Sequence, residues 1–295
     1  MIPNFFIIGS AKAGTSSLQQ YLSQHPQVFM SAIKEPHYLC AEHFPPKFTG
    51  PGDEGFSEHI TRTREQYLSL FAKADGYRVI GEASVYYLSF PSTAQRIKEL
   101  NPAAKLVAVL RNPVDRAFSA YLHTVRDGRE TLTFEEALAA EPDRKQRGYQ
   151  PLWWYREIGL YSKGVAEYLR VFGPDQIKVY LYEDLKNIAR VLHEIFHFMG
   201  IEPLTIDTSI RYNVSGIPKS RFLYTFFAQP NWFKNALKPL FPTALRQRLG
   251  HRAKALTLRK VEMRPETKRE LQEYYRDDIL ALQELLHRDL SHWLT

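Results

Sequence analysis

The sequence predicts an α/β protein: a parallel, P-loop-like sheet flanked by helices and folded as a single domain over residues 1–295. Two observations carry this prediction. Short apolar runs alternate along the chain with segments whose apolar residues recur at helical spacing, and this alternation is typical of a parallel, doubly wound sheet. The first run, residues 5–8, continues into a glycine loop and then a helix-like pattern, which is the arrangement of an anion-binding loop.

The predicted strands are short and mostly apolar. Residues 105–110 form the clearest one, because their apolar side chains are nearly continuous, and we expect this strand in the middle of the sheet. The other strands are expected at residues 5–8, 28–30, 78–84 and 176–182.

Helices are predicted where apolar residues recur every three to four positions. Pro113 suits the first turn of the helix after the central strand. Residues 41–60 are rich in Pro, Gly and mixed charge and are expected to form an irregular surface loop or lid. Residues 127–152 are expected to be irregular apart from one helix. The predicted helices are residue 15 onward, 67–71, 94–100, 113–122, 134–139, 161–172, 191–199 and 266–287.

The loop after the first strand is opened by Gly9 and closed by Gly14. Glycines let backbone N–H groups close on a phosphate, and the dipole of the following helix favours an anion. A nucleoside-triphosphate P-loop has its lysine directly after the second glycine, where this chain has Thr15, whereas Lys12 lies inside the loop. The loop is therefore predicted to bind a phosphate-like group with its cation displaced. The alternative is an ordinary strand-to-helix turn.

Further charged residues lie at the ends of predicted strands. Arg111 follows the central strand, Glu82 lies near the end of another, and Lys34 and Glu35 follow a third. Ligands of open α/β sheets bind beyond the carboxyl ends of the strands, so we expect these side chains on the same rim as the glycine loop. Each has a structural alternative: an exposed Lys34–Glu35 ion pair, a helix-end contact of Arg111 with Asp115, and a buried polar partner for Glu82.

The composition is that of an ordinary soluble globular protein, with 44% hydrophobic and 24% charged residues. The one cysteine, Cys40, excludes an internal disulfide and is compatible with a reducing compartment. The N-terminal residues lack the pattern of a signal peptide, and no apolar run approaches the length of a membrane span. We therefore expect a cytoplasmic protein.

The net charge of +7 is unevenly distributed, since residues 211–269 contain 14 Lys or Arg against 2 Asp or Glu. The basic, aromatic-rich region at about 211–265 predicts either an anionic partner or a lid with an acceptor-binding surface. Within it, residues 221–240 would form an amphipathic element at a membrane surface or a lid packed on the core. No nucleic-acid partner is expected.

Together, these motifs resemble the family of sulfotransferases that use 3′-phosphoadenosine 5′-phosphosulfate (PAPS), in particular its heparan-sulfate and tyrosylprotein branch and their bacterial relatives. The glycine loop is similar to the family's 5′-phosphosulfate site, and residues 110–121 are similar to its 3′-phosphate site. Residues 34–38 resemble the segment that carries the catalytic glutamate. The resemblance runs nearly end to end and implies one sulfotransferase domain. Further similarity lies at residues 180–185, 213–220 and 289–294.

The resemblance implies a role for each motif. Lys12 would contact the phosphosulfate and stabilise the charge that develops on the leaving phosphate. Glu35 would act as general base toward an acceptor hydroxyl of a carbohydrate, a lipid or a small natural product. Arg111 and Ser119 would hold the 3′-phosphate. The remaining nucleotide contacts, the last three in a loop that closes over the nucleotide, would come from Ala13, Gly14, Thr15, Ser16, Ser17, Ser215, Gly216 and Lys219.

Four residues are acceptor-side candidates: Glu82, His37, Trp153 and Trp154. Glu82 would orient the loop lysine or the acceptor, and the tryptophans would line the cleft or stack on a sugar; the alternative for each is burial in the core. Heparan-type members carry a lysine directly after the glutamate that Glu82 matches, where this chain has Ala83. This departure argues against a heparan-like acceptor.

Three other functions fit parts of the sequence. A P-loop phosphotransferase would need a lysine at position 15 or a magnesium-binding acid at a strand end. A zinc hydrolase would use His193 and His197, which match the His-Glu-x-x-His pattern, with a third ligand at Glu202 or Asp207. A non-catalytic polyanion-binding module would use the basic region. A transferring sulfuryl group carries less charge than a phosphoryl group, so the sulfotransferase interpretation requires no metal.

Overall fold

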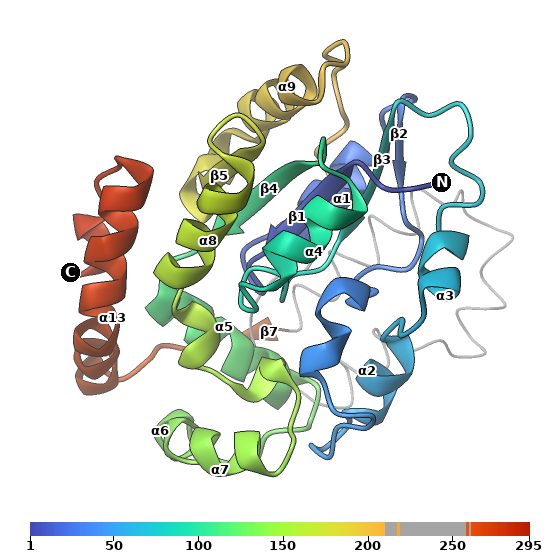
Figure 1. Cartoon of the computed structure of the whole chain (residues 1–295). Helices are drawn as coiled ribbons and strands as arrows, with labels where there is room; N and C mark the ends of the chain where they lie inside the picture. The colour runs from blue at the N-terminus through green and yellow to red at the C-terminus, as the bar shows by residue number, and fades with distance from the viewer. Residues whose placement is uncertain (210–216, 219–257, 260) are drawn as a thin grey trace, which may run out of the picture.

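The computed structural model describes residues 1–209, 217–218, 258–259 and 261–295. Its centre is a parallel sheet of five strands in the order β2-β3-β1-β4-β5 (Figure 1). The five strands predicted from the sequence are confirmed, and β4 lies inside the sheet between β1 and β5. Their bounds are β1 (Phe5–Gly9), β2 (Val28–Met30), β3 (Val79–Ala83), β4 (Lys105–Leu110) and β5 (Ile177–Leu181).

Helices connect the strands and flank the sheet (Figure 1). Their ends follow local signals: α5 starts at Pro113, and the Asn112 side chain caps it by accepting a hydrogen bond from the Val114 amide at 3.0 Å. The α-helices are α1 (Thr15–Leu22), α2 (Glu54–His59), α3 (Arg64–Ser69), α4 (Thr93–Leu100), α5 (Pro113–Arg126), α6 (Phe134–Ala139), α7 (Glu141–Gln146), α8 (Ser162–Phe172), α9 (Ile188–Met199) and α13 (Pro265–Leu286).

Short 3₁₀ helices and one further strand pair complete the described elements. The 3₁₀ helices are η1 (Tyr38–His43), η2 (Pro151–Trp153), η3 (Glu157–Gly159), η4 (Tyr182–Asn187) and η6 (Ser291–Trp293). Strands β6 (Ile217–Pro218) and β7 (Leu258–Arg259) pair in antiparallel fashion.

Alternate residues of β1 face opposite sides of the sheet and belong to two separate cores. Phe6 and Ile8 pack in the core that contains side chains from α4, α5, α8 and α13. Phe5 and Ile7 pack in the other core, with side chains from α1 and α9. All four are at most 1% exposed, and burying each stabilises the fold by about 1.5–3 kcal/mol. Because both faces of the sheet are covered, a ligand is expected at the strand ends.

Residues 41–60 are more ordered than the sequence predicted. The segment contains α2, and its Asp53 is fully buried. The Asp53 carboxylate accepts hydrogen bonds from the Gln150 amide at 2.9 Å and from Trp153 Nε1 at 3.0 Å, and it pairs with Arg129. Residues 44–53 contain no helix or strand, as predicted, but the expectation of a surface loop was wrong for α2 and the buried Asp53. Distant residues hold the segment, and local composition does not reveal such contacts.

Residues 127–152 also contain a helix that the sequence analysis missed. Helix α7 follows α6 directly, and a buried ion pair supports this part of the chain. The Arg144 guanidinium donates two hydrogen bonds to the Glu130 carboxylate, at 2.6 and 2.9 Å. Two-point pairing of this kind is geometrically specific, so charged residues here build structure rather than an irregular surface.

None of the helices in the described ranges combines the length and apolar character that a membrane crossing requires.

Candidate active site

The loop between β1 and α1 has the backbone of an anion cradle. Lys12 and Gly14 have positive φ angles of 69° and 91°, which turn the chain sharply into α1. The φ of 91° at Gly14 strains any residue with a side chain, and a Cβ there would also lie 2.8 Å from Leu185 Cδ1 of η4. The first turn of α1 follows the N-cap residue Gly14, which has no side chain to cap it. Its N–H groups and the helix dipole therefore favour an anion.

A cleft of about 810 Å³ lies over this loop and gathers most of the predicted nucleotide-binding residues. Its lining includes Lys12, Gly14, Thr15, Ser16, Ser17, Glu35, Arg111 and Ser119. Of the predicted nucleotide-binding residues that the structure describes, Ala13 is the exception, because its side chain is fully buried in the core beneath the loop and its amide donates to Ser10 O at 3.3 Å. The side chain of Ala13 therefore packs in the core and does not contact a ligand in the cleft.

Arg111 is held at the end of β4 with part of its guanidinium unused. Its Nη1 donates to the carbonyl of Lys12 at 3.2 Å, and the guanidinium lies 4.8 Å from the centre of the Tyr182 ring. Its Nε is buried and has no hydrogen-bond partner among the described residues. Asp115, the alternative partner considered from sequence, is exposed. A cation with an unsatisfied buried donor is suited to an anionic ligand.

Lys12 sits in a desolvated and positively charged setting. Burial, together with the charges of Arg126 and Arg111, lowers its pKa to about 7, against opposing contributions from Asp127 and Glu35. Water loss and like charges both disfavour the ammonium form. An anion bound in the cradle would favour the ammonium form and raise the pKa of Lys12 again.

Glu35 lies in the cleft wall at the end of the loop after β2. Its amide donates to Ala83 O at 2.9 Å, and its carboxylate forms an ion pair with Lys34 and lies 3.5 Å from His37 Nε2. Burial alone would raise the pKa of Glu35, but the charge of Lys34 and the contact with His37 outweigh it and hold the pKa well below its usual range. Glu35 is therefore an ionised carboxylate at neutral pH. Glu35 therefore combines both expected features: it forms an ion pair with Lys34, and it lines the cleft.

The four acceptor-side candidates do not line the cleft. His37 is fully buried and stacks on Tyr86, with ring centres 5.1 Å apart. Glu82 is fully buried below the Glu35 loop. Trp153 and Trp154 are 1% and 8% exposed, and each donates its ring N–H to a protein acceptor. The alternative of burial in the core is thus the observed one: Glu82 and the two tryptophan N–H groups have internal hydrogen-bond partners, whereas neither ring nitrogen of His37 has one among the described residues.

Several cleft residues were not predicted from the sequence, and His123 is the most prominent of them. It lies on α5, one helical turn after Ser119, and spacing of four residues on a helix was the available signal. Burial, followed by the charges of Lys12, Arg126 and Arg129, lowers its pKa well below the ordinary value. His123 is therefore neutral at neutral pH. Other lining residues that were not predicted are Phe56, Tyr86, Arg129, Leu152, Tyr182 and Lys186.

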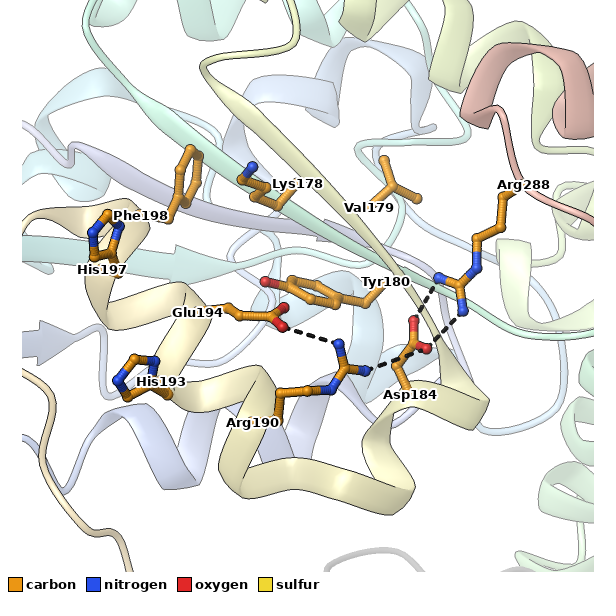
Figure 2. Close-up of a pocket in the computed structure, with 10 residues that line it drawn as sticks. All are labelled: Lys178, Val179, Tyr180, Asp184, Arg190, His193, Glu194, His197, Phe198 and Arg288. Atoms are coloured by element: carbon orange, nitrogen blue, oxygen red, sulfur yellow. Dashed lines mark hydrogen bonds and ion pairs between the residues drawn. The ribbon is translucent and has the colours of Figure 1, made fainter.

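The turn η4 lies between the cleft and the C-terminal segment. Tyr182 and Leu185 face the cleft, whereas Asp184 accepts two hydrogen bonds from Arg288, both at 2.7 Å (Figure 2). Trp293 Nε1 also donates to Glu183 at 2.9 Å. The C-terminal residues thus hold the turn that packs against the anion loop.

A second hollow, of about 650 Å³, contains the His-Glu-x-x-His pattern (Figure 2). His193, Glu194 and His197 lie along α9, and Glu194 accepts a hydrogen bond from Arg190 at 2.9 Å. The part of the chain that the structure describes holds no group of three or more His, Cys, Asp or Glu side chains placed to bind one metal ion. The zinc-hydrolase alternative therefore gains no support.

Three predicted residues, Ser215, Gly216 and Lys219, lie outside the described residues. The same holds for residues 221–240 and for most of the predicted basic region at 211–265.

The fold and the site together define an α/β protein with a P-loop-like anion site faced by an ionised carboxylate. A family model described as "Sulfotransferase family" matches residues 3–205, and the chain belongs to this family. The solved structure of a sulfotransferase from Alicyclobacillus acidocaldarius is 40% identical, covers 100% of both chains and superposes with a TM-score of 0.80.

Two curated relatives match over shorter parts of their length. Carbohydrate sulfotransferase 15 of Mus musculus is 27% identical over 266 residues, which is 69% of this chain and 45% of the relative. Heparan sulfate glucosamine 3-O-sulfotransferase 3A1 of Mus musculus is 28% identical over 224 residues, 74% of this chain and 51% of the relative. The chain thus spans about half the length of these relatives.

Proposed function

We propose that this protein transfers the sulfuryl group of PAPS to an acceptor hydroxyl. The observation that carries the proposal is that the Lys12 ammonium and the ionised Glu35 carboxylate line one cleft and interact electrostatically across it. The first belongs to an anion loop and the second has the chemistry of a general base. Membership of the sulfotransferase family supports the same class of reaction.

The residues present fit the two anionic ends of PAPS. The cradle and the hydroxyls of Thr15, Ser16 and Ser17 suit the 5′-phosphosulfate, because they offer donors at a helix N-terminus. Arg111 suits the 3′-phosphate, since its buried Nε has no partner within the described ranges, and Ser119 lines the same cleft. When bound, PAPS would supply the activated sulfuryl group. The proposal assigns no metal.

The proposed reaction assigns one task to each charged side chain. The acceptor oxygen bonds to sulfur while the bond from sulfur to the 5′-phosphate oxygen breaks, and Glu35 takes the acceptor proton. Lys12, inside the anion loop, would stabilise the negative charge that grows on the leaving phosphate, and a positioned donor of this kind is worth on the order of 3 kcal/mol. The pair with Lys34 weakens the base in the free protein. An acceptor that draws Lys34 away would therefore strengthen it.

The rest of the lining supports a proposed range of acceptors. Phe56, Val85, Tyr86 and Leu152 give the cleft an apolar part, and the rings of Phe56 and Tyr86 adjoin His37 beside Glu35. Such a surface fits a hydroxyl carried on a sugar ring or an apolar body. The names of the relatives, which refer to carbohydrate and heparan sulfate, support a carbohydrate. Lipid and small natural-product alcohols belong to the same proposed range.

The test is transfer of radiolabelled sulfate from PAPS to a panel of desulfated oligosaccharides, alkyl glycosides and phenols. Glu35→Gln should lower kcat by about 10²–10⁴-fold while leaving nucleotide affinity near normal. Glu42→Gln is the matched control, since Glu42 is an exposed carboxylate seven residues along the same segment. Absence of transfer to every acceptor would contradict the proposal. Full activity of Glu35→Gln would remove Glu35 as the base.

A further inference from the structure

Glu82 is a fully buried carboxylate surrounded by three hydroxyl donors. Tyr67 and Tyr87 donate to its Oε1 at 2.9 and 2.7 Å, and Ser84 donates to its Oε2 at 2.7 Å. Burial raises its pKa to about 7, although the three hydrogen bonds act in the opposite direction. A buried carboxylate is costly, and this one does not line the cleft. The groups that its three donors bind in turn therefore indicate its role.

Two of the three donors also accept hydrogen bonds from the segment that carries Glu35. Ser84 Oγ accepts from the His37 amide at 3.1 Å, and Tyr87 Oη accepts from the Leu39 amide at 3.3 Å. A hydroxyl has one proton, and once that proton is directed at Glu82, its lone pairs are left for the amides. Glu82 therefore orients both hydroxyls as acceptors toward the loop.

The third donor, Tyr67, does not bind a loop amide in this way. Its ring stacks on Tyr38 with centres 4.5 Å apart, but within the described part of the chain its hydroxyl accepts no hydrogen bond from a loop amide. The same carboxylate thus has two donors whose oxygens bind loop amides and one, Tyr67, that contacts the loop only through its ring, which a Phe substitution keeps. This difference provides an internal control.

The loop needs such support because its backbone is unusual. Glu35 and His37 have φ angles of 62° and 53°, a left-handed conformation that non-glycine residues rarely adopt. Such residues persist only where their surroundings hold them. Three contacts tie the loop to the end of β3 and the turn after it: the Glu35 amide to Ala83 O, and the two amides bound by the oriented hydroxyls.

We propose that Glu82 is a positioning residue that, through Ser84 and Tyr87, holds the left-handed loop so that the Glu35 carboxylate stays in the cleft. The inference rests on the proposed function, because it supposes that Glu35 is the base. It gives the buried carboxylate a role in turnover without contact to either substrate.

The test compares Ser84→Ala and Tyr87→Phe with the control Tyr67→Phe. The first two should lower kcat by about tenfold or more, since small misplacements of a reacting group have effects of that size, with the affinity for 3′-phosphoadenosine 5′-phosphate (PAP) unchanged. Tyr67→Phe should stay within about twofold of wild type in kcat, although it removes a donor from the same carboxylate. Glu82→Gln should resemble the first pair. Equal kcat in all three hydroxyl variants would overturn the inference.

Hydrogen exchange separates this inference from the proposed function. The His37 and Leu39 amides should exchange faster in Ser84→Ala and Tyr87→Phe, respectively, than in Tyr67→Phe. If wild type binds PAP and transfers sulfate but the loop amides exchange alike in all variants, the Ser84 and Tyr87 hydroxyls do not hold the loop. The further inference then fails, and the proposed function stands. If wild type shows no transfer, the proposed function fails, and the exchange rates alone decide whether the hydroxyls hold the loop.

Discussion

Binding of PAP is predicted to draw a proton onto Lys12. Burial and neighbouring cations lower the pKa of Lys12 to about 7, so at pH 8 only about one tenth of the free protein carries this charge. Phosphate groups in the cradle favour the ammonium form and raise its pKa. Binding at pH 8 should therefore take up about 0.9 proton, and Kd should rise about tenfold between pH 8 and 9.

The assay is calorimetric titration with PAP in buffers of different ionisation enthalpy, where the slope of the observed enthalpy gives the number of protons taken up. At pH 8 the ligand phosphates have lost their protons, since their second pKa is about 6, and add little to the signal. Lys12→Arg is the control, because a guanidinium is charged throughout this range. Proton uptake near zero in wild type, or unchanged uptake in Lys12→Arg, would refute the reasoning.

The contacts around the site support three further predictions. Arg288→Ala removes both hydrogen bonds to Asp184 and should lower stability by about 1 kcal/mol, since the pair is partly exposed, and weaken PAP binding a few-fold by loosening η4. Arg276→Ala, an exposed change on α13, should leave PAP binding unaltered in the same titration. Gly14→Ala places a methyl group at φ 91° against η4 and should cost about 1–3 kcal/mol in thermal unfolding and most of the PAP affinity. Glu82 keeps its proton up to a pKa of about 7 in the folded protein but releases it near 4.5 when unfolded. Its contribution to stability is therefore lost as pH rises from about 5 to 7, by up to a few kcal/mol. Glu82→Gln should flatten urea midpoints over that window, and an unchanged slope would contradict the assignment.

The elements could be predicted because the signals for them are local. Apolar runs marked the strands, and the proline at position 113 marked the start of α5. The meeting of Lys12, Glu35 and Arg111 in one cleft also followed from the sequence, since the carboxyl ends of parallel strands share one edge. The burial of Asp53 within residues 41–60 could not be predicted, because the residues that hold its carboxylate lie about a hundred positions away in the sequence.

The direction in which a side chain points could not be predicted at the strand ends. Glu82 lies on a strand covered on both faces, so period-two alternation does not say whether its carboxylate faces ligand or core. Trp153 and His37 likewise reach the core through contacts with other segments. Tyr182 lies in the segment 180–185 that the resemblance includes, but its contact with the Arg111 guanidinium could not be predicted, because the contact depends on how η4 folds back on the loop.

Calorimetric titration with PAP, with ADP and with ATP plus Mg²⁺ as comparators tests the central claim most directly. The account predicts metal-independent binding of PAP that is about tenfold or more tighter than that of ADP, because only PAP offers a 3′-phosphate to Arg111. Preference for ATP with Mg²⁺ would point to a phosphotransferase, and absence of nucleotide binding would contradict the sulfotransferase account altogether.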